Sequence, residues 1–338
     1  MTDISPVISA IVAFIATAVS GVYALPVLKR LKFGQTILED GPQWHQKKQG
    51  TPTMGGIIMI FGVLVALCAA FAYGMIAKVN IFSEVKTNKF IIFLASVGLA
   101  LFMGIIGFLD DYIKVVKKRN LGLTARQKTV LQLFFSALYL AVLAFSGVKT
   151  TWLPFVGDVN IVSGVGLLFW PIALMFIYGF INAVNLTDGV DGLASSVTLI
   201  VCCIFMLITG GLRLAGANMF ASAVAGACVG FLVWNSHPAK MFMGDTGSLF
   251  LGGAVVGLAF CTGRPILLLL IGVVYLCEAL SVVIQVTYFK KTKKRIFKMT
   301  PIHHHFEMSG WGEEKIVLIF SLVSMAFGAV AVLISGLL

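Results

Sequence analysis

The chain has 338 residues, of which 59% are hydrophobic and only 12% charged, and its formal net charge is +11. A water-soluble domain of this length needs far more polar surface, so the composition excludes that class. Apolar runs long enough to cross a hydrocarbon core of about 30 Å recur along the whole chain. We therefore expect an all-α, polytopic integral membrane protein in which residues 1–338 form a single domain.

Ten apolar segments are candidate transmembrane helices. In chain order they are 6–28, 55–77, 90–109, 129–147, 167–184, 193–212, 217–234, 247–262, 265–289 and 316–337. The eighth segment is short, and Gly252, Gly253 and Gly257 within it predict close helix packing. The ninth carries Glu278 inside its apolar run, so we expect this span to be bent or broken. Glu278 has either a structural role or a place beside a lipid channel.

The positive charges are divided unevenly between the two sides of the predicted bundle. With ten spans, the connecting loops alternate between the sides. Nineteen of the 25 lysines and arginines fall on one side, in 29–48, 114–128, at Lys240 and in 290–315. Basic loops face the cytoplasm, so we expect this side there and both termini outside. Because these charges flank spans rather than line one groove, they do not indicate nucleic-acid binding.

Five aspartates fall on the same predicted side. Asp110 and Asp111 end the third span, Asp188 and Asp191 follow the fifth, and Asp245 opens the eighth. A carboxylate at a span end is costly unless it meets water, a cation or a partner. Carboxylate oxygens without a nearby cysteine suit Mg²⁺ or Mn²⁺. The pattern predicts a divalent-cation site, with ordinary solvated loop acids as the alternative.

Basic and histidine side chains accompany these acids. Lys48, Lys114 and the HHHFE sequence at 303–307 lie on the same predicted side. For the histidines, phosphate binding or proton handling is favoured over a structural role. Acids for a metal and cations for phosphate at one membrane face predict phosphoryl transfer onto a lipid.

Five motifs occur in order at the predicted cytoplasmic span ends. They are KQGTPTMGG, LDDYIK, NAVNLTDGVDGLA, WNSHPAKMFMGDTGSL and PIHHHFEMSGW. As a set they resemble the polyprenyl-phosphate N-acetylhexosamine-1-phosphate transferase superfamily, and within it the phospho-N-acetylmuramoyl-pentapeptide transferase family. The resemblance covers nearly the whole chain.

This resemblance implies a reaction and a location. Phospho-MurNAc-pentapeptide would pass from UDP-MurNAc-pentapeptide to undecaprenyl phosphate, giving lipid I and UMP in peptidoglycan synthesis, with Mg²⁺ as cofactor. The enzyme would span the bacterial inner membrane with its active site on the cytoplasmic face. Members of the family are commonly homodimers.

The resemblance also assigns roles to residues. It implies catalytic roles for Asp110, Asp111, Asp245 and His304, and we assign the metal to Asp245, Asp111 and Asp191. One of the paired aspartates would position or deprotonate the lipid phosphate. The implied substrate-binding residues are Lys48, Thr53, Lys114, Asn182, Asn185, Asp188, Asp191, Asn235, Phe242, Gln285, His303 and His305.

Two other functions and a second mechanism are considered. A sister transferase would move GlcNAc-1-phosphate instead. An ion-coupled transporter would also carry acids and broken helices, but usually near the membrane midplane rather than at one face. A single displacement by the lipid phosphate is favoured over a route through an aspartyl-phosphate.

Overall fold

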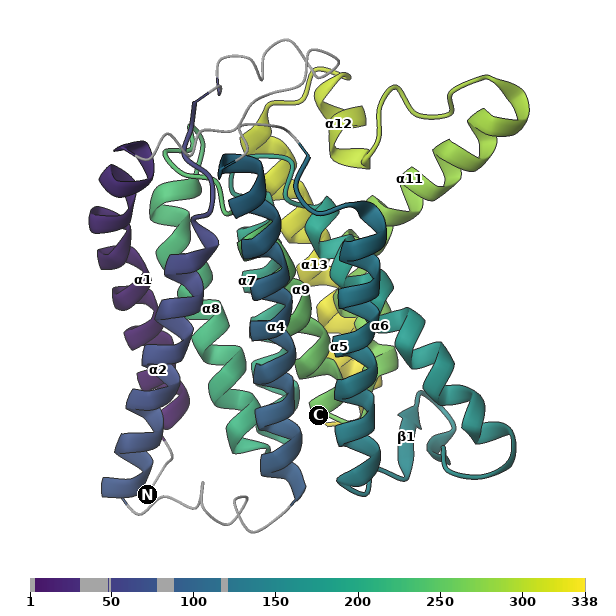
Figure 1. Ribbon diagram of the computed structural model, residues 1–338. Coiled ribbons are helices and arrows are strands. Elements are labelled where there is room, and N and C mark those ends of the chain that lie inside the picture. The colour runs from purple at the N-terminus through teal and green to yellow at the C-terminus, as the bar shows by residue number, and fades with distance from the viewer. Residues whose placement is uncertain (1–3, 31–47, 49, 78–87, 117–120, 338) are drawn as a thin grey trace.

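The structure is a computed structural model that describes residues 4–30, 48, 50–77, 88–116 and 121–337. Within these segments, ten helices are long and apolar enough to cross a membrane, which confirms the predicted all-α polytopic class. They are α1 (Ser5–Arg30), α2 (Gly56–Ile76), α4 (Asn88–Val116), α5 (Ala125–Phe145), α6 (Phe169–Leu186), α7 (Leu193–Gly211), α8 (Ala215–Asn235), α9 (Gly244–Cys261), α11 (Val273–Thr292) and α13 (Glu313–Ile334). Figure 1 shows them as one bundle.

The third helix is longer than the sequence analysis predicted. The predicted span ends at 109, whereas α4 continues to Val116. Asp110 and Lys114 are one turn apart on this extension, and the carboxylate lies 2.6 Å from the ammonium group. An acid and a base four residues apart stabilise a helix, so charges that looked like a loop extend α4 instead.

The ninth span is broken, as predicted. Segment 265–289 divides into η3 (Pro265–Leu267), α10 (Leu268–Ile271) and α11, with Gly272 in a non-helical conformation between the last two. A Cβ atom at Gly272 would lie 2.9 Å from the Leu268 carbonyl oxygen, which favours glycine at this bend. Beyond the break, α11 leaves the bundle at a steep angle (Figure 1).

Helix α9 is the buried centre of the bundle. Of its apolar 18-residue window, 83% is buried, a larger share than in the other spans described. A Cβ atom at Gly253 would lie 2.8 Å from the Ala100 Cα atom of α4. The predicted close packing of the eighth span is therefore confirmed. It brings the N-terminal end of α9 against the C-terminal end of α4.

Two smaller features were not predicted. A hairpin of β1 (Thr150–Leu153) and β2 (Gly157–Asn160) is antiparallel, with Thr150 opposite Asn160, and is followed by η2 (Gly164–Leu168). The Trp152 backbone N–H donates to the Gly263 carbonyl oxygen at 2.9 Å, which ties the hairpin to the turn after α9. The histidine motif forms a short helix, α12 (Ile302–Glu307), where a loop was expected.

The two ends of the bundle differ in content. Helix α12 and the C-terminal end of α4 lie at one end, whereas the hairpin and the start of α1 lie at the other (Figure 1). An even number of crossing helices returns the chain to the side on which it began. The cytoplasmic assignment stays a prediction from charge. Seven residues in that comparison lie outside the described residues: Lys32, Lys47, Lys78, Lys86, Lys117, Lys118 and Arg119.

Candidate active site

Three carboxylates from two helices meet at one end of the bundle. Asp110 and Asp111 lie in the last two turns of α4, and Asp245 is the second residue of α9. One oxygen from each carboxyl group lies within 4.8 Å of the others. Carboxylates this close repel one another unless cations neutralise them. We call Asp110, Asp111 and Asp245 the acidic triad.

Two lysines supply part of that neutralisation. The Lys114 Nζ atom lies 2.6 Å from Asp110 Oδ2 and 3.0 Å from Asp245 Oδ2. The Lys128 Nζ atom approaches the same Asp245 oxygen at 2.9 Å. Three carboxylates thus face two ammonium groups. A site with this donor set can accept a further cation, and its charged side chains can exchange partners with phosphate oxygens.

Lys128 was missed by the sequence analysis, which counted it only as a basic loop residue. It belongs to the first turns of α5, whose start is fixed by Thr124 and Gln127. The Thr124 hydroxyl accepts from the Gln127 backbone N–H, and the Gln127 side-chain oxygen accepts from the Thr124 backbone N–H. This reciprocal capping box places Lys128 one turn into the helix. Its approach to Asp245 depends on how α5 packs near α9, which the sequence does not display.

Asp111 joins α4 to α9. Its Oδ2 atom accepts from the Thr246 backbone N–H at 2.9 Å and from the Thr246 hydroxyl at 2.7 Å. The start of a helix has unpaired N–H donors and favours negative charge, so Asp111 caps α9 from a neighbouring helix. At Gly107 a Cβ atom would collide with the Asp245 carbonyl oxygen, so glycine permits this close approach.

The accessibility of the triad differs between its members. The Asp245 side chain is 20% exposed, compared with 5% for Asp110 and 4% for Asp111. The Asp110 Oδ1 atom accepts from the Leu123 backbone N–H at 2.9 Å. Asp245 is therefore the member best placed to meet a ligand from solution, while Asp110 and Asp111 are held by backbone donors.

The two predicted asparagines point to different partners. The Asn185 amide donates to Asp245 Oδ1 at 2.9 Å and to the Ser248 hydroxyl at 2.7 Å, so it belongs to the triad's surroundings. The Asn182 amide donates to Gln132 Oε1 at 2.9 Å. Asn182 thus links α6 to α5 rather than contacting an acid of the triad.

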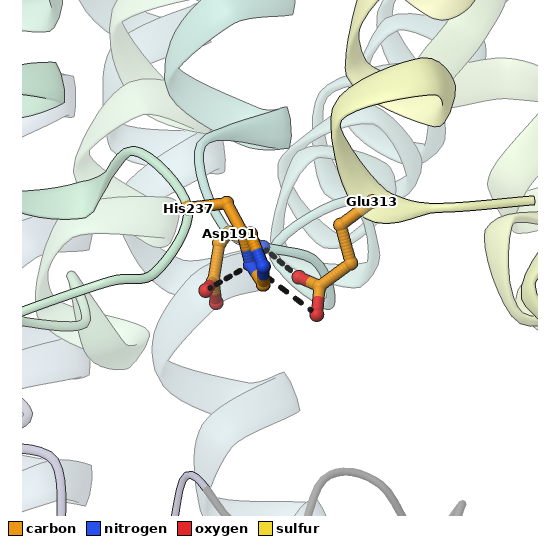
Figure 2. Close-up of side chains that lie close together, drawn as sticks. All are labelled: Asp191, His237 and Glu313. Carbon is orange, nitrogen blue, oxygen red and sulfur yellow. Dashed lines mark hydrogen bonds and ion pairs between the residues drawn. The ribbon is translucent and has the colours of Figure 1, made fainter.

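A second cluster brings Asp191 together with His237 and Glu313, two residues that the sequence analysis missed (Figure 2), and with Lys48. The Lys48 Nζ atom lies 2.7 Å from Asp191 Oδ1 and 2.6 Å from Glu313 Oε2. The His237 Nδ1 atom lies 3.1 Å from Asp191 Oδ2 and 3.6 Å from Glu313 Oε1. We call these four residues the Lys48 cluster. In the sequence, His237 lies within the motif WNSHPAKMFMGDTGSL, and Glu313 lies two residues beyond the motif PIHHHFEMSGW.

The predicted metal ligands are therefore shared between two clusters. Among the described residues, Asp111 and Asp245 gather with Asp110, whereas Asp191 gathers with His237 and Glu313. Both groups have ligand atoms close enough to hold a cation. In the second group, however, the Lys48 ammonium already lies between the two carboxylates.

Asp188 is influenced by both clusters. It is half-buried in the turn between α6 and α7. Burial raises the pKa of Asp188 from 3.8 to about 8, and the negative charges of Asp245, Asp111 and Asp191 add to this effect. Asp188 therefore holds a proton near neutral pH unless a cation comes close.

The residues expected near the nucleotide are held mainly by backbone contacts. The buried Asn235 side chain accepts from the Gly192 N–H at 3.0 Å and donates to the Met241 carbonyl oxygen at 3.0 Å. The Phe242 backbone N–H donates to the Pro52 carbonyl oxygen at 2.8 Å. A Cβ atom at Gly244 would lie 2.7 Å from the Thr53 hydroxyl. These contacts hold the segment around 52–56 against the loop that leads into α9.

Gln285 has a different setting. Its side-chain oxygen accepts from the Ile296 and Phe297 backbone N–H groups, each at 3.0 Å. The side chain thus fixes the chain that returns from α11 toward α12. Within the described part of the chain, the hydrogen bonds of Gln285 lead to Ile296 and Phe297 rather than to Asn235 or Phe242, so its place beside the nucleotide stays a prediction.

The three consecutive histidines have three different partners. The His303 Nδ1 atom lies 3.0 Å from Glu278 Oε2, and the His304 Nδ1 atom lies 2.6 Å from Glu307 Oε2. His305 Nδ1 accepts from the Lys298 backbone N–H at 3.1 Å. His303 also packs against the turn between Asp188 and Asp191, because a Cβ atom at Gly189 would collide with its ring. The buried Glu278 of α11 is thus paired with His303 of α12.

The chain is similar to known proteins over almost its whole length. Residues 90–263 match glycosyl transferase family 4, and residues 48–60 match signature 1 of phospho-N-acetylmuramoyl-pentapeptide-transferase. The chain is 46% identical to the phospho-N-acetylmuramoyl-pentapeptide-transferase of Carboxydothermus hydrogenoformans over 332 residues, 96% of each chain. It is 44% identical to that of Clostridioides difficile over 329 residues, again 96% of each. The protein therefore belongs to the phospho-N-acetylmuramoyl-pentapeptide-transferase family.

Proposed function

We propose that this protein transfers phospho-MurNAc-pentapeptide from UDP-MurNAc-pentapeptide to undecaprenyl phosphate, giving lipid I and UMP. The observation that carries the proposal is the acidic triad with its two lysines at one end of a ten-helix bundle. Family membership supplies the substrates. Carboxylates and ammonium groups at one end of the helix bundle could bind a cation and a diphosphate beside a lipid.

The donors of the triad fit Mg²⁺. All are carboxylate oxygens, and Mg²⁺ in proteins usually binds one or two carboxylates, with waters and substrate phosphate oxygens in the remaining positions. We propose Asp245 as the principal ligand because it is the most exposed member, with Asp111 beside it. When bound there, the cation supplies positive charge to the diphosphate. We place Asp191 with the substrate instead, because Lys48 already pairs with its carboxylate.

The residues of the triad would bind and align the reacting groups. In a single displacement, an oxygen of the lipid phosphate attacks the sugar-linked phosphorus and UMP leaves. Lys114 and Lys128 would orient phosphate oxygens, since each already holds its ammonium group among the carboxylates. Asp110 would position the lipid phosphate. With a second pKa of about 6, that phosphate is largely ionised at neutral pH, so alignment matters more than proton removal.

The Lys48 cluster would recognise the donor. Its ammonium and carboxylates lie beside Asn235, because Asn235 accepts from the N–H of the residue after Asp191. Polar groups of this kind suit the uracil and ribose. Phe242 offers a half-buried aromatic face for the base. His304, proposed from the resemblance as catalytic, and His305 would serve the pyrophosphate or sugar end.

The remaining parts of the proposal concern setting and assembly. We place the triad on the cytoplasmic face of a bacterial inner membrane, because most lysines and arginines belong to loops of that side. A homodimer is proposed from family resemblance alone.

The decisive test is a transfer assay on the purified protein in lipid nanodiscs. UMP release from UDP-MurNAc-pentapeptide is expected with undecaprenyl phosphate present, is expected to stop with EDTA, and should return with added Mg²⁺. UDP-GlcNAc is the matched competing donor. UMP release from UDP-GlcNAc alone would establish the sister reaction instead. Substrate uptake into liposomes without UMP formation would establish a transporter.

A further inference from the structure

A carboxylate of α11 and an imidazole of α12 form a buried pair. Glu278 lies in the second turn of α11 and is completely buried, and His303 of α12 is 1% exposed. The Glu278 Oε2 atom lies 3.0 Å from His303 Nδ1 and accepts from the His303 backbone N–H at 3.4 Å. One oxygen therefore fixes both the ring and the first turn of α12.

The pair sets which ring nitrogen carries the proton. A carboxylate accepts hydrogen bonds and cannot donate them, so the Nδ1 atom of His303 must be the donor. The Nε2 atom is then the ring position left for another group. This atom is buried and has no hydrogen-bond partner among the described residues, and Glu278 Oε1 is in the same condition. Buried polar atoms without partners are rare, because each loses its hydration without compensation.

The neighbouring turn shows where this ring lies. At Gly189 a Cβ atom would collide with Nε2 and the adjacent ring carbon of His303. Gly189 follows Asp188 directly and lies two residues before Asp191, so the unpartnered nitrogen lies beside the turn that carries two of the site's acids. The other two histidines do not offer this combination, since His305 accepts from a backbone N–H and His304 pairs with Glu307.

We propose that Glu278 is a positioning residue for His303, holding the ring so that Nε2 can accept a hydrogen bond from a sugar hydroxyl of the bound sugar diphosphate. The inference rests on the proposed function. Glu278 does not touch the substrate itself. It holds the proton on Nδ1 and fixes the orientation of the ring, so that Nε2 stays directed at the turn between Asp188 and Asp191.

A double-mutant cycle tests the proposal. The variants are Glu278→Ala, Glu278→Gln, His303→Ala and the double Ala variant, with kcat and KM for UDP-MurNAc-pentapeptide measured in nanodiscs. Ser281→Ala is the control, because Ser281 is buried one turn along α11 and, among the residues that the structure describes, its hydroxyl donates to the Glu278 carbonyl oxygen and not to its carboxylate. Size-exclusion profiles and melting temperatures identify any variant that fails to fold.

The expected result is a shared loss. A carboxylate that orients a functional histidine typically contributes about 10- to 100-fold, so Glu278→Ala should lower kcat by that factor. Glu278→Gln should recover part of it, because the amide oxygen still accepts from Nδ1. In the His303→Ala background, removing Glu278 should change kcat less than about twofold. The proposal is overturned if the kcat losses of Glu278→Ala and His303→Ala multiply in the double variant. It is also overturned if Ser281→Ala lowers kcat as much as Glu278→Ala does.

A spectroscopic measurement separates this proposal from the proposed function. If the wild-type protein releases no UMP from UDP-MurNAc-pentapeptide, the proposed function fails. The pairing is then judged by ¹⁵N NMR of histidine-labelled protein, with His303→Ala identifying the signal. A ring protonated at Nδ1 that changes in Glu278→Gln supports the pair. A neutral ring protonated at Nε2 alone overturns it.

Discussion

The acidic triad with its two lysines and the Lys48 cluster both bring acids and lysines together from distant segments. They differ in the elements that carry their side chains. The triad lies on long helices, with Asp110 and Asp111 on α4, Asp245 on α9 and Lys128 on α5. The Lys48 cluster draws mainly on connecting segments, and its His237 side chain is 40% exposed. Groups on packed helices hold their geometry better than groups on loops.

The charges of the two clusters also differ. In the triad three carboxylates face two lysines, whereas in the Lys48 cluster two carboxylates share one lysine beside a histidine. The first arrangement leaves room for a metal and a transferring phosphate. With the imidazole counted as neutral, the second arrangement has the same net charge of −1, but its ammonium group lies between both carboxylates, which suits recognition of a nucleotide. Variants in the triad should therefore lower kcat, and variants in the Lys48 cluster should raise KM.

Asp245→Asn is expected to give the largest effect. The amide keeps the shape of the side chain but removes the charge that would bind the cation, so kcat should fall by about 10²- to 10³-fold. Asp158→Asn is the matched control, because Asp158 belongs to the hairpin at the opposite end. UMP release measured over a range of Mg²⁺ concentrations checks both variants. Wild-type turnover of Asp245→Asn at the same Mg²⁺ level would remove Asp245 as the essential ligand.

Lys128→Met is expected to act in two directions. Loss of one charge-assisted contact to phosphate should lower kcat by about 10- to 100-fold. Because Lys128 competes with a cation for Asp245 Oδ2, the variant should also bind Mg²⁺ more tightly. A Mg²⁺ titration of UMP release separates the two effects. Weaker Mg²⁺ binding by the variant would contradict the competition.

Glu313→Gln should affect substrate binding instead. Without the second carboxylate, Lys48 is held by Asp191 alone, and we expect KM for UDP-MurNAc-pentapeptide to rise by about 10-fold with kcat nearly unchanged. The neighbouring exposed Glu314 provides the control Glu314→Gln. A fall in kcat without a change in KM would mean that the two clusters do not divide the work in this way.

Asp188 predicts a pH dependence of cation binding. Its pKa is raised to about 8, so below that pH the metal-free site holds a proton that a cation must displace. Apparent Mg²⁺ affinity should rise severalfold from about pH 6.5 to 8 and then level off, and Asp188→Asn should flatten the profile. The same shift should make the metal-free protein less stable as pH rises from 3.8 toward 8, because the folded state binds this proton more tightly. Calorimetry in buffers of different ionisation heat measures the released proton.

The smallest effect is expected at Asn182. Asn182 lies one turn before Asn185 on α6, and its amide donates to Gln132 rather than to an acid of the triad. Asn182→Ala should therefore change kcat less than about twofold. Asn185→Ala removes a donor to Asp245 and is the contrasting variant. Equal losses in the two variants would show that Asn182 reaches the site during turnover.

Much of the fold could be predicted because membrane-crossing helices have long apolar runs. The ten spans and the break near Glu278 follow from this pattern and from a charge that the membrane disfavours. The predicted end of the third span was wrong, because the sequence displays the charged residues of α4 but not the pairing of Asp110 with Lys114. The hairpin was missed because two four-residue strands give little periodic signal.

The sequence predicted which acids and lysines belong to the site better than it predicted which of them lie together. The aspartates, Lys48 and Lys114 were found from their positions at span ends. Lys128, His237 and Glu313 were missed because their contacts arise from how α5, α9, α13 and a loop pack together. For the same reason, the separation of Asp191 from Asp111 and Asp245 could not be seen from spacing along the chain.

The shortness of α9 has a consequence for how the two substrates meet. Its 18 residues rise about 27 Å, while the 29 residues of α4 rise about 44 Å. Asp245 lies in the first turn of the shorter helix, and Asp110 and Asp111 lie six and five residues before the end of the longer one, so the carboxylates lie below the C-terminal end of α4. We expect the lipid to keep its phosphate at headgroup depth during the reaction. The water-soluble nucleotide would then move along the membrane normal until its diphosphate lies between the helix ends.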